Sequence, residues 1–155
     1  MPPPWPRIPP LKAAIGEPMR YVFIILTLLG VTVSALALRE HYREGDSPCS
    51  INDRWDCGIV NHSPYAMIGP IPVAVIGMLG YILMGALAWR RSWKLLLLCA
   101  AAGLGFSLYL AHIEKDILGV WCIYCVISLG TMSLITLLAV GTAIAARKPV
   151  APVKN

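Results

Sequence analysis

Four long apolar segments dominate this sequence and limit what it can fold into. None of them contains Asp, Glu, Lys or Arg. Each is close to the roughly 20 residues that an α-helix needs to cross a hydrocarbon core about 30 Å thick. Their apolar residues follow neither the helical nor the strand period, which argues against an amphipathic surface. We therefore expect an all-α integral membrane four-helix bundle with spans at Tyr21–Leu38, Ile71–Ala88, Leu95–Ala111 and Val120–Ala146.

The distribution of charge predicts how the bundle is oriented. The net charge is +5, but basic and acidic residues flank opposite ends of the expected spans. Short cytoplasmic connections collect Lys and Arg, so we expect both termini in the cytoplasm and the first and third connections outside. The net positive charge then reflects membrane topology and does not indicate nucleic-acid binding. The basic residues on the expected cytoplasmic side are Arg7, Lys12 and Arg20 before the first span, Arg90, Arg91 and Lys94 in the second connection, and Arg147, Lys148 and Lys154 after the fourth span.

The sequence divides into three regions. We expect a disordered cytoplasmic leader at 1–18, because six prolines precede Leu11 and such composition is typical of disorder. A four-span domain follows at 19–147, and a cytoplasmic tail at 148–155. The first connection is expected to form an outer loop or short helix. A cleavable signal peptide is the alternative for the first span, but its apolar run is longer than a usual signal core.

Four of the five cysteines lie on the expected outer side. Cys49 and Cys57 are in the first outer connection, and Cys122 and Cys125 are at the start of the fourth span. One helical turn places two Cα atoms roughly 5–6 Å apart, a distance that a disulfide permits. If Trp121 marks the helix start, the helix dipole favours the Cys122 thiolate. The fifth cysteine, Cys99, is near the cytoplasmic end of the third span, where packing is the default role.

Three interpretations of the four outer cysteines remain open. A redox relay would use the loop pair as a mobile donor beside the fixed helix pair. Two structural disulfides are the second interpretation, although a bundle in lipid does not need such links as a small secreted domain does. A zinc site is the third, but the eight-residue step from Cys49 to Cys57 exceeds the usual ligand spacing.

With these residues in hand, the chain resembles the vitamin K epoxide reductase family in its bacterial branch. The resemblance covers the first through the fourth span. It rests on the Cys49 and Cys57 step, on Ser63 six residues later, and on Cys122-Ile-Tyr-Cys125. Phe106-Ser-Leu-Tyr-Leu with Glu114, and Ile71-Pro-Val-Ala-Val, add to it. The loop pair precedes the helix pair, which separates this pattern from the DsbB family.

The resemblance implies a four-helix bundle around a quinone of the menaquinone, ubiquinone or vitamin K type. It implies that Cys122 and Cys125 are the catalytic pair, with Cys125 facing the quinone, and that Cys49 and Cys57 shuttle electrons to them. Ser63 is then a loop hydroxyl near the active centre, and an N-cap is its alternative role. We also interpret Asn61, Met67 and Trp121 as candidate quinone-site residues.

The expected function is a membrane thiol oxidoreductase that supports disulfide-bond formation in the bacterial inner membrane. Vertebrate members carry tyrosine four residues after the second active cysteine, where this chain has Leu129. That difference favours reoxidation of a DsbA-like or thioredoxin-like protein over epoxide reduction. The sequence ends at Asn155, so this partner is expected to be a separate extracytoplasmic protein.

Overall fold

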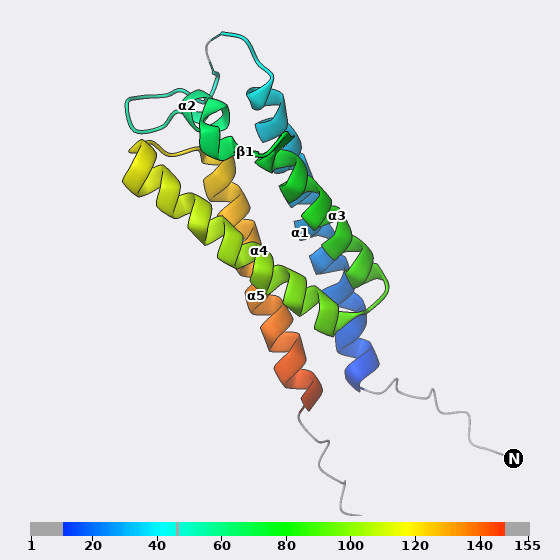
Figure 1. Cartoon of the computed structure of the whole chain (residues 1–155). Helices are drawn as coiled ribbons and strands as arrows, with labels where there is room; N and C mark the ends of the chain where they lie inside the picture. The colour runs from blue at the N-terminus through cyan, green and yellow to red at the C-terminus, as the bar shows by residue number, and fades with distance from the viewer. Residues whose placement is uncertain (1–10, 46, 148–155) are drawn as a thin grey trace, which may run out of the picture.

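Four long helices form an elongated bundle in the computed structural model, which describes residues 11–45 and 47–147 (Figure 1). Helix α1 packs along α3, and α4 packs along α5. The long helices are α1 (Leu11–His41), α3 (Val73–Trp89), α4 (Trp93–Ile113) and α5 (Ile123–Arg147). Successive long helices run in opposite directions, so the α3–α4 turn lies at the end of the bundle where α1 begins. The expected all-α membrane bundle is therefore confirmed.

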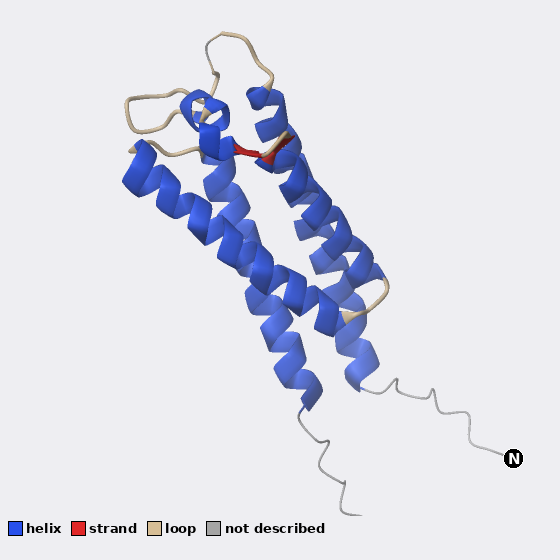
Figure 2. Ribbon diagram, viewed as in Figure 1, coloured by secondary structure: helices blue, strands red, loops and turns tan. Residues whose placement is uncertain are grey.

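Short elements gather at the other end of the bundle. They belong to the segment between α1 and α3, residues 42–45 and 47–72, which we call the cap (Figure 2). The cap contains helix α2 (Cys57–His62), the 3-10 helix η1 (Pro64–Ala66), and strands β1 (Met67–Ile68) and β2 (Ile71–Pro72). The two strands pair antiparallel as a short hairpin. Its turn holds Gly69 at a φ of 60°, a left-handed conformation that glycine adopts without steric cost.

Three of the helical segments are long and apolar enough to cross a membrane. They are Glu17–His41, Trp93–Leu118 and Ile123–Ala145, with mean hydropathies of 2.4, 1.9 and 2.1. The fourth, α3, is apolar but has 17 residues, which corresponds to about 26 Å of helix. Large apolar side chains are exposed on the outer faces of the bundle, including Ile25, Leu98 and Leu137. Such surfaces suit a lipid environment, and the chain is a membrane protein.

Two of the predicted boundaries differ from the structure. Helix α1 begins at Leu11, so residues 11–18, expected to be part of a disordered leader, are helical. Apolar and Ala residues outnumber the prolines in this stretch, and Pro18 is accommodated inside the helix. Residues 1–10 and the predicted tail at 148–155 lie outside the described residues. At the other junction, Ile71 and Pro72 form a strand, and the second span starts at Val73.

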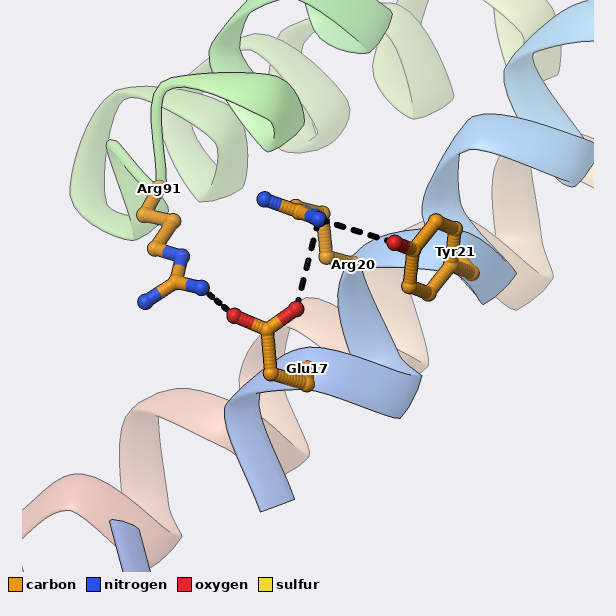
Figure 3. Close-up of polar contacts among 4 residues, drawn as sticks. All are labelled: Glu17, Arg20, Tyr21 and Arg91. Atoms are coloured by element: carbon orange, nitrogen blue, oxygen red, sulfur yellow. Dashed lines mark hydrogen bonds and ion pairs between the residues drawn. The ribbon is translucent and has the colours of Figure 1, made fainter. Parts of the chain in front are cut away.

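Polar contacts join α1 to the α3–α4 turn at the end opposite the cap (Figure 3). Glu17 forms ion pairs with Arg20, at 3.2 Å, and with Arg91. The Arg20 guanidinium lies 4.9 Å from the centroids of both the Tyr21 and the Trp89 rings. Basic groups that stack on aromatic rings at a helix end are typical of a membrane interface. The main core of the bundle lies between this end and the cap: Phe23, Tyr81, Met84, Ala88, Leu96, Ala100, Met132, Ile135 and Ala139.

Candidate functional site

The two outer cysteine pairs meet where the cap covers the start of α5. Cys49 and Cys57 form a disulfide with their Cα atoms 5.5 Å apart, whereas Cys122 and Cys125 are unpaired. Cys57 and Cys122 have no solvent-exposed surface, and both belong to one buried cluster with Cys49, Val60 and Val120. Tyr124 and Cys125 pack against that cluster. The fold therefore brings together all four cysteines that the sequence singles out.

Backbone pairing fastens the segment before Cys57 to the segment before Cys122. The Asp56 N–H donates to the Trp121 carbonyl at 3.0 Å, and the Trp121 N–H donates to the Arg54 carbonyl at 2.9 Å. Trp55 and Trp121 form a parallel bridge. Cys57 and Cys122 each follow a residue of this bridge closely, and the pairing thus sets the register between the two cysteines.

Asp56 starts the short helix that carries Cys57. Its Oδ1 accepts a hydrogen bond from the Ile59 N–H at 3.0 Å, which is N-cap geometry. This bond holds the pKa of the Asp56 carboxyl below its ordinary value, because donors to a carboxylate favour its charged form. The cap bond matters because an isolated helix of six residues has little stability of its own.

Asn61 links the two cysteine pairs. Its amide nitrogen donates to the Cys57 carbonyl at 2.8 Å and to the Cys122 Sγ at 3.6 Å. The backbone carbonyl oxygen of Asn61 is in turn 2.5 Å from the Nδ1 of His41, at the end of α1. The His41 ring stacks on His62, with centroids 6.1 Å apart. Asn61 thus holds α2 against both the Cys122 sulfur and the end of α1.

Cys122 and Cys125 occupy different environments although they are three residues apart. The Cys122 carbonyl accepts the first α5 hydrogen bond, from the Val126 N–H at 3.0 Å, so Cys122 precedes the helix rather than lying inside it. A hydrogen bond from the Cys125 thiol is the main cause that lowers the pKa of Cys122, and nearby backbone N–H groups add to it. Burial and the charge of Glu114 oppose this effect. Cys122 is therefore the thiol that more readily becomes the reactive thiolate.

A cavity of about 410 Å³ extends from this site into the bundle. Cys125, Asn61 and Ser63 line its cap end, and Cys99 and Met132 line it near the main core. Its walls are mostly apolar, with a few polar groups near Cys125. This volume and this mixture are typical of sites that bind small organic molecules. A flat, mostly apolar ring with polar oxygens, such as a quinone, suits these residues.

The candidate quinone-site residues do not all reach this cavity. Asn61 and Ser63 line it, and the Ser63 Oγ donates to the Val60 carbonyl at 2.8 Å. Ser63 precedes Pro64 at the start of η1, but its side chain makes no capping bond. Met67 and Trp121 are not among the lining residues, since Met67 pairs with Pro72 in the hairpin and Trp121 pairs with the cap. The structure therefore gives these two residues no place at the cavity.

Two residues at the site were missed as functional candidates from the sequence. His41 lines the cavity from the end of α1, and Glu114 lines it from the junction of α4 with the π-helix η2 (Glu114–Leu118). The Glu114 Oε2 accepts the Cys122 N–H at 3.0 Å. The available signal was position: Glu114 is the first charged residue after the third apolar segment, and ionisable groups at the ends of spans are costly unless they have a function.

No group of three or more His, Cys, Asp or Glu side chains that could hold a metal ion occurs in residues 11–45 and 47–147. The zinc interpretation of the four cysteines therefore gains no support from their arrangement. The disulfide between Cys49 and Cys57 also leaves only two of the four sulfurs as free thiols.

Comparison with known protein families gives one match. The model of the vitamin K epoxide reductase family matches residues 21–140, a range that includes α3, α4, the cap, both cysteine pairs and most of α1 and α5. No curated protein matches the chain.

Proposed function

Because the chain belongs to the vitamin K epoxide reductase family, it is a membrane thiol–disulfide oxidoreductase that uses a quinone, and we propose that it relays electrons from a protein dithiol through Cys49–Cys57 and then Cys122–Cys125. The working unit of this relay is the segment 19–147, which holds the bundle and the cap.

The shared burial of Cys57 and Cys122 carries this proposal. Both side chains have no exposed surface, they lie in one cluster, and Asn61 contacts the Cys57 carbonyl and the Cys122 sulfur. Exchange between two pairs needs a thiolate next to a disulfide sulfur, with a free sulfur left to resolve the link. The arrangement supplies both, because Cys122 has its lowered pKa and Cys125 is its neighbour.

The electron path follows from the order of the pairs. A reduced partner attacks Cys49, forms a mixed disulfide and leaves oxidised, so that Cys49 and Cys57 become thiols. Cys57 then attacks Cys122 in an oxidised Cys122–Cys125 pair, and Cys49 resolves the link. The bound quinone serves as the final acceptor of two electrons and two protons. Partner dithiol and quinone thus become partner disulfide and hydroquinone, and both cysteine pairs regain their disulfides.

The cap must open for this reaction. The Cys49 side chain is 6% exposed and that of Cys57 is 0% exposed, so a protein partner cannot reach the disulfide in the closed arrangement. A few backbone hydrogen bonds hold the cap against Trp121. Such limited pairing favours local opening of the cap. The partner we propose is a thioredoxin-like or DsbA-like protein, because family members usually work with such proteins.

The orientation we propose places the cap outside the bacterial inner membrane and both termini in the cytoplasm. The basic residues of the α3–α4 turn, Arg90 and Arg91, lie at the opposite end of the bundle from the cap. An oxidising compartment on the cap side is what a Cys49–Cys57 disulfide requires.

Quinone reduction by the purified protein tests the proposal. We expect the protein to consume menaquinone or ubiquinone when it is given a reduced thioredoxin-like protein. Cys122→Ala or Cys125→Ala should abolish this activity with any reductant. Cys49→Ala or Cys57→Ala should abolish it with the protein dithiol but leave activity with a small membrane-permeant dithiol. Cys99→Ala is the control and should retain activity. Full activity of all four outer variants with the protein dithiol would refute the relay.

Trapping the link between the pairs separates the relay from static disulfides. Removal of Cys49 or Cys125 deletes a resolving sulfur, so a stable Cys57–Cys122 disulfide should accumulate. Cleavage of the chain between these residues should then give fragments that stay joined until they are reduced. Two static disulfides predict no such link, and a zinc site predicts four thiols that are protected from alkylation until a chelator is added.

A further inference from the structure

Glu114 is a buried carboxylic acid at the helix pair of cysteines. Its side chain is 2% exposed, and it lies at the first position of η2, where α4 ends. Oε2 accepts the Cys122 N–H at 3.0 Å, and the side chain lines the same cavity as Cys125. Glu114 therefore contacts the reacting pair at Cys122 and shares the cavity with Cys125.

The second carboxyl oxygen of Glu114 is unused. Oε1 is buried and has no hydrogen-bond partner within residues 11–45 and 47–147. A buried polar atom without a partner is unfavourable, so its retention calls for a reason. The same side chain lines the cavity that we assign to the quinone. The residue with the free oxygen thus lines the same cavity as Cys125.

The local backbone explains how the carboxyl group reaches this position. Residues Glu114–Leu118 form a π-helix, whose wider turn shifts the register of side chains relative to α4. Gly119 then ends the π-helix at a φ of 68°, a left-handed conformation suited to glycine. The chain turns there and leads through Trp121 to Cys122, so the Cys122 N–H faces back toward Glu114.

We propose that Glu114 is a catalytic residue that accepts the proton of the Cys125 thiol as the helix pair is oxidised and passes it to the quinone oxygen. The inference rests on the proposed function. Oxidation of the pair breaks two S–H bonds and forms one S–S bond, which releases two electrons and two protons. The electrons go to the quinone. One proton reaches the quinone through Glu114, the other is released to water at the cap, and the quinone takes its second proton from water.

Other titratable groups line the same cavity, and the test must distinguish their effects from that of Glu114. His41, on α1, is already engaged by the Asn61 carbonyl at 2.5 Å. Tyr81, on α3, is engaged by the Ser128 carbonyl at 3.0 Å. The titratable side chains that line the cavity besides Glu114 are His41, Tyr65, Tyr81, Cys99, Tyr124 and Cys125.

Glu114→Gln separates the proton step from the structural contact. The amide oxygen of Gln still accepts the Cys122 N–H, but Gln cannot take a proton. Exchange between the loop pair and the helix pair should therefore change far less than quinone reduction. Quinone reduction should fall about 10²-fold or more, the usual contribution of general acid–base catalysis. The loss should shrink as the pH rises, because hydroxide then removes the Cys125 proton. Asp116→Asn is the matched control, since Asp116 is an exposed acid of the same π-helix.

A second measurement needs neither quinone nor turnover. In a Cys49→Ala, Cys57→Ala, Cys99→Ala background, the pH dependence of alkylation reports the Cys122 thiol. The charge of Glu114 raises the pKa of Cys122, so Glu114→Gln should shift the alkylation profile to lower pH, and Asp116→Asn should not. An unchanged profile would mean that the carboxyl group carries no charge in the reduced protein and has no capacity to accept a proton, which would overturn the inference.

Two further outcomes distinguish failure of the role of Glu114 from failure of the proposed function. Wild-type quinone reduction in Glu114→Gln at every pH would overturn the role of Glu114 and leave the relay intact. A wild-type protein that reduces no quinone with any dithiol would overturn the proposed function itself.

Discussion

Cys122 and Cys125 differ because one precedes α5 and the other lies in its first turn. Cys122 is fully buried under the cap, with donors from Asn61, Cys125 and nearby backbone around its sulfur. Cys125 lines the cavity. The two sulfurs therefore face different partners: Cys122 faces the loop pair, and Cys125 faces the space for the acceptor. This division matches the order of steps in the proposed relay.

The role of the Cys125 thiol as a donor can be tested directly. Its hydrogen bond stabilises the Cys122 thiolate, which lowers the pKa of Cys122. Cys125→Ala should therefore raise that pKa and move the alkylation of Cys122 to higher pH. Cys125→Ser keeps a hydroxyl donor and should retain most of the lowering. The measurement is the alkylation rate against pH in the variant that lacks Cys49, Cys57 and Cys99. Equal profiles for the Ala and Ser variants would show that the hydrogen bond is not the cause.

At the scale of single elements, α2 is a short helix with little support of its own. It has six residues and is held by its N-cap, by Asn61 and by the backbone pairing of Asp56 with Trp121. A short helix with few fastenings opens at low cost. That property suits an element whose first residue, Cys57, must alternate between two disulfide partners in the proposed relay.

The N-cap of α2 gives a prediction about opening. Asp56→Ala should destabilise the closed cap by about 1 kcal/mol. Small thiols should then reduce the Cys49–Cys57 disulfide roughly 5-fold faster, because reduction follows the open population. Asp56→Asn retains an acceptor oxygen and should behave like the wild type. Equal reduction rates for the Ala variant and the wild type would contradict the capping role.

The same contact gives a pH dependence. The pKa of Asp56 is lowered from 3.8 by the Ile59 N–H. The stabilisation is therefore complete above this ordinary pKa and is lost as the pH falls through the lower pKa of the folded state. The reduction rate of the wild type, corrected for the titration of the attacking thiol, should rise in that acidic range. The Asp56→Asn variant should show no such rise.

The contact between α1 and α3 depends on a glycine. A Cβ at Gly30 would overlap the Tyr81 ring. The ring cannot move freely, because the Tyr81 hydroxyl is fixed 3.0 Å from the Ser128 carbonyl on α5. Overpacking of this kind costs about 1–3 kcal/mol. Gly30→Ala should therefore lower the midpoint of thermal unfolding in detergent. Gly141→Ala is the control, since a Cβ there meets nothing within 4 Å, and a similar loss in both variants would refute the packing argument.

At the scale of the whole molecule, the cysteine pairs and the basic α3–α4 turn occupy opposite ends. The cysteine pairs and the cap lie at one end of the bundle, and the Glu17, Arg20 and Arg91 contacts lie at the other (Figures 1 and 3). The cavity connects the cap end with the interior. In the proposed relay, this polarity lets a dithiol act from the water side while an apolar acceptor enters from the lipid.

The polarity predicts the result of reporter fusions. An alkaline phosphatase fused within the cap should be active, because it reaches the outer compartment, and one fused in the α3–α4 turn should be inactive. The charge distribution is the reason, since Lys and Arg are retained in the cytoplasm. Substitution of Arg90, Arg91 and Lys94 by Gln should weaken the asymmetry. An inverted pattern would place all four redox cysteines in a reducing compartment and would be incompatible with the relay.

The sequence by itself determined the spans and the identity of the cysteine pairs. Length and hydropathy are properties of a continuous segment, so the four apolar segments predicted four long helices that the structure contains. The boundaries were less accurate, because the caps and breaks at Leu11 and Val73 depend on neighbouring elements. The Cys122-Ile-Tyr-Cys125 spacing was readable for the same reason, because it belongs to one short continuous segment.

Only the tertiary structure decided which other residues join the cysteines. Asn61 reaches Cys122 across 61 positions of sequence, and Glu114 reaches the Cys122 N–H across 8 positions through a π-helix and a left-handed glycine. Met67 and Trp121, which are close to the site in sequence, take part in backbone pairing and are not among the residues that line the cavity. Side-chain direction at such positions is set by long-range packing and by the local turn, and neither is encoded in hydropathy or spacing.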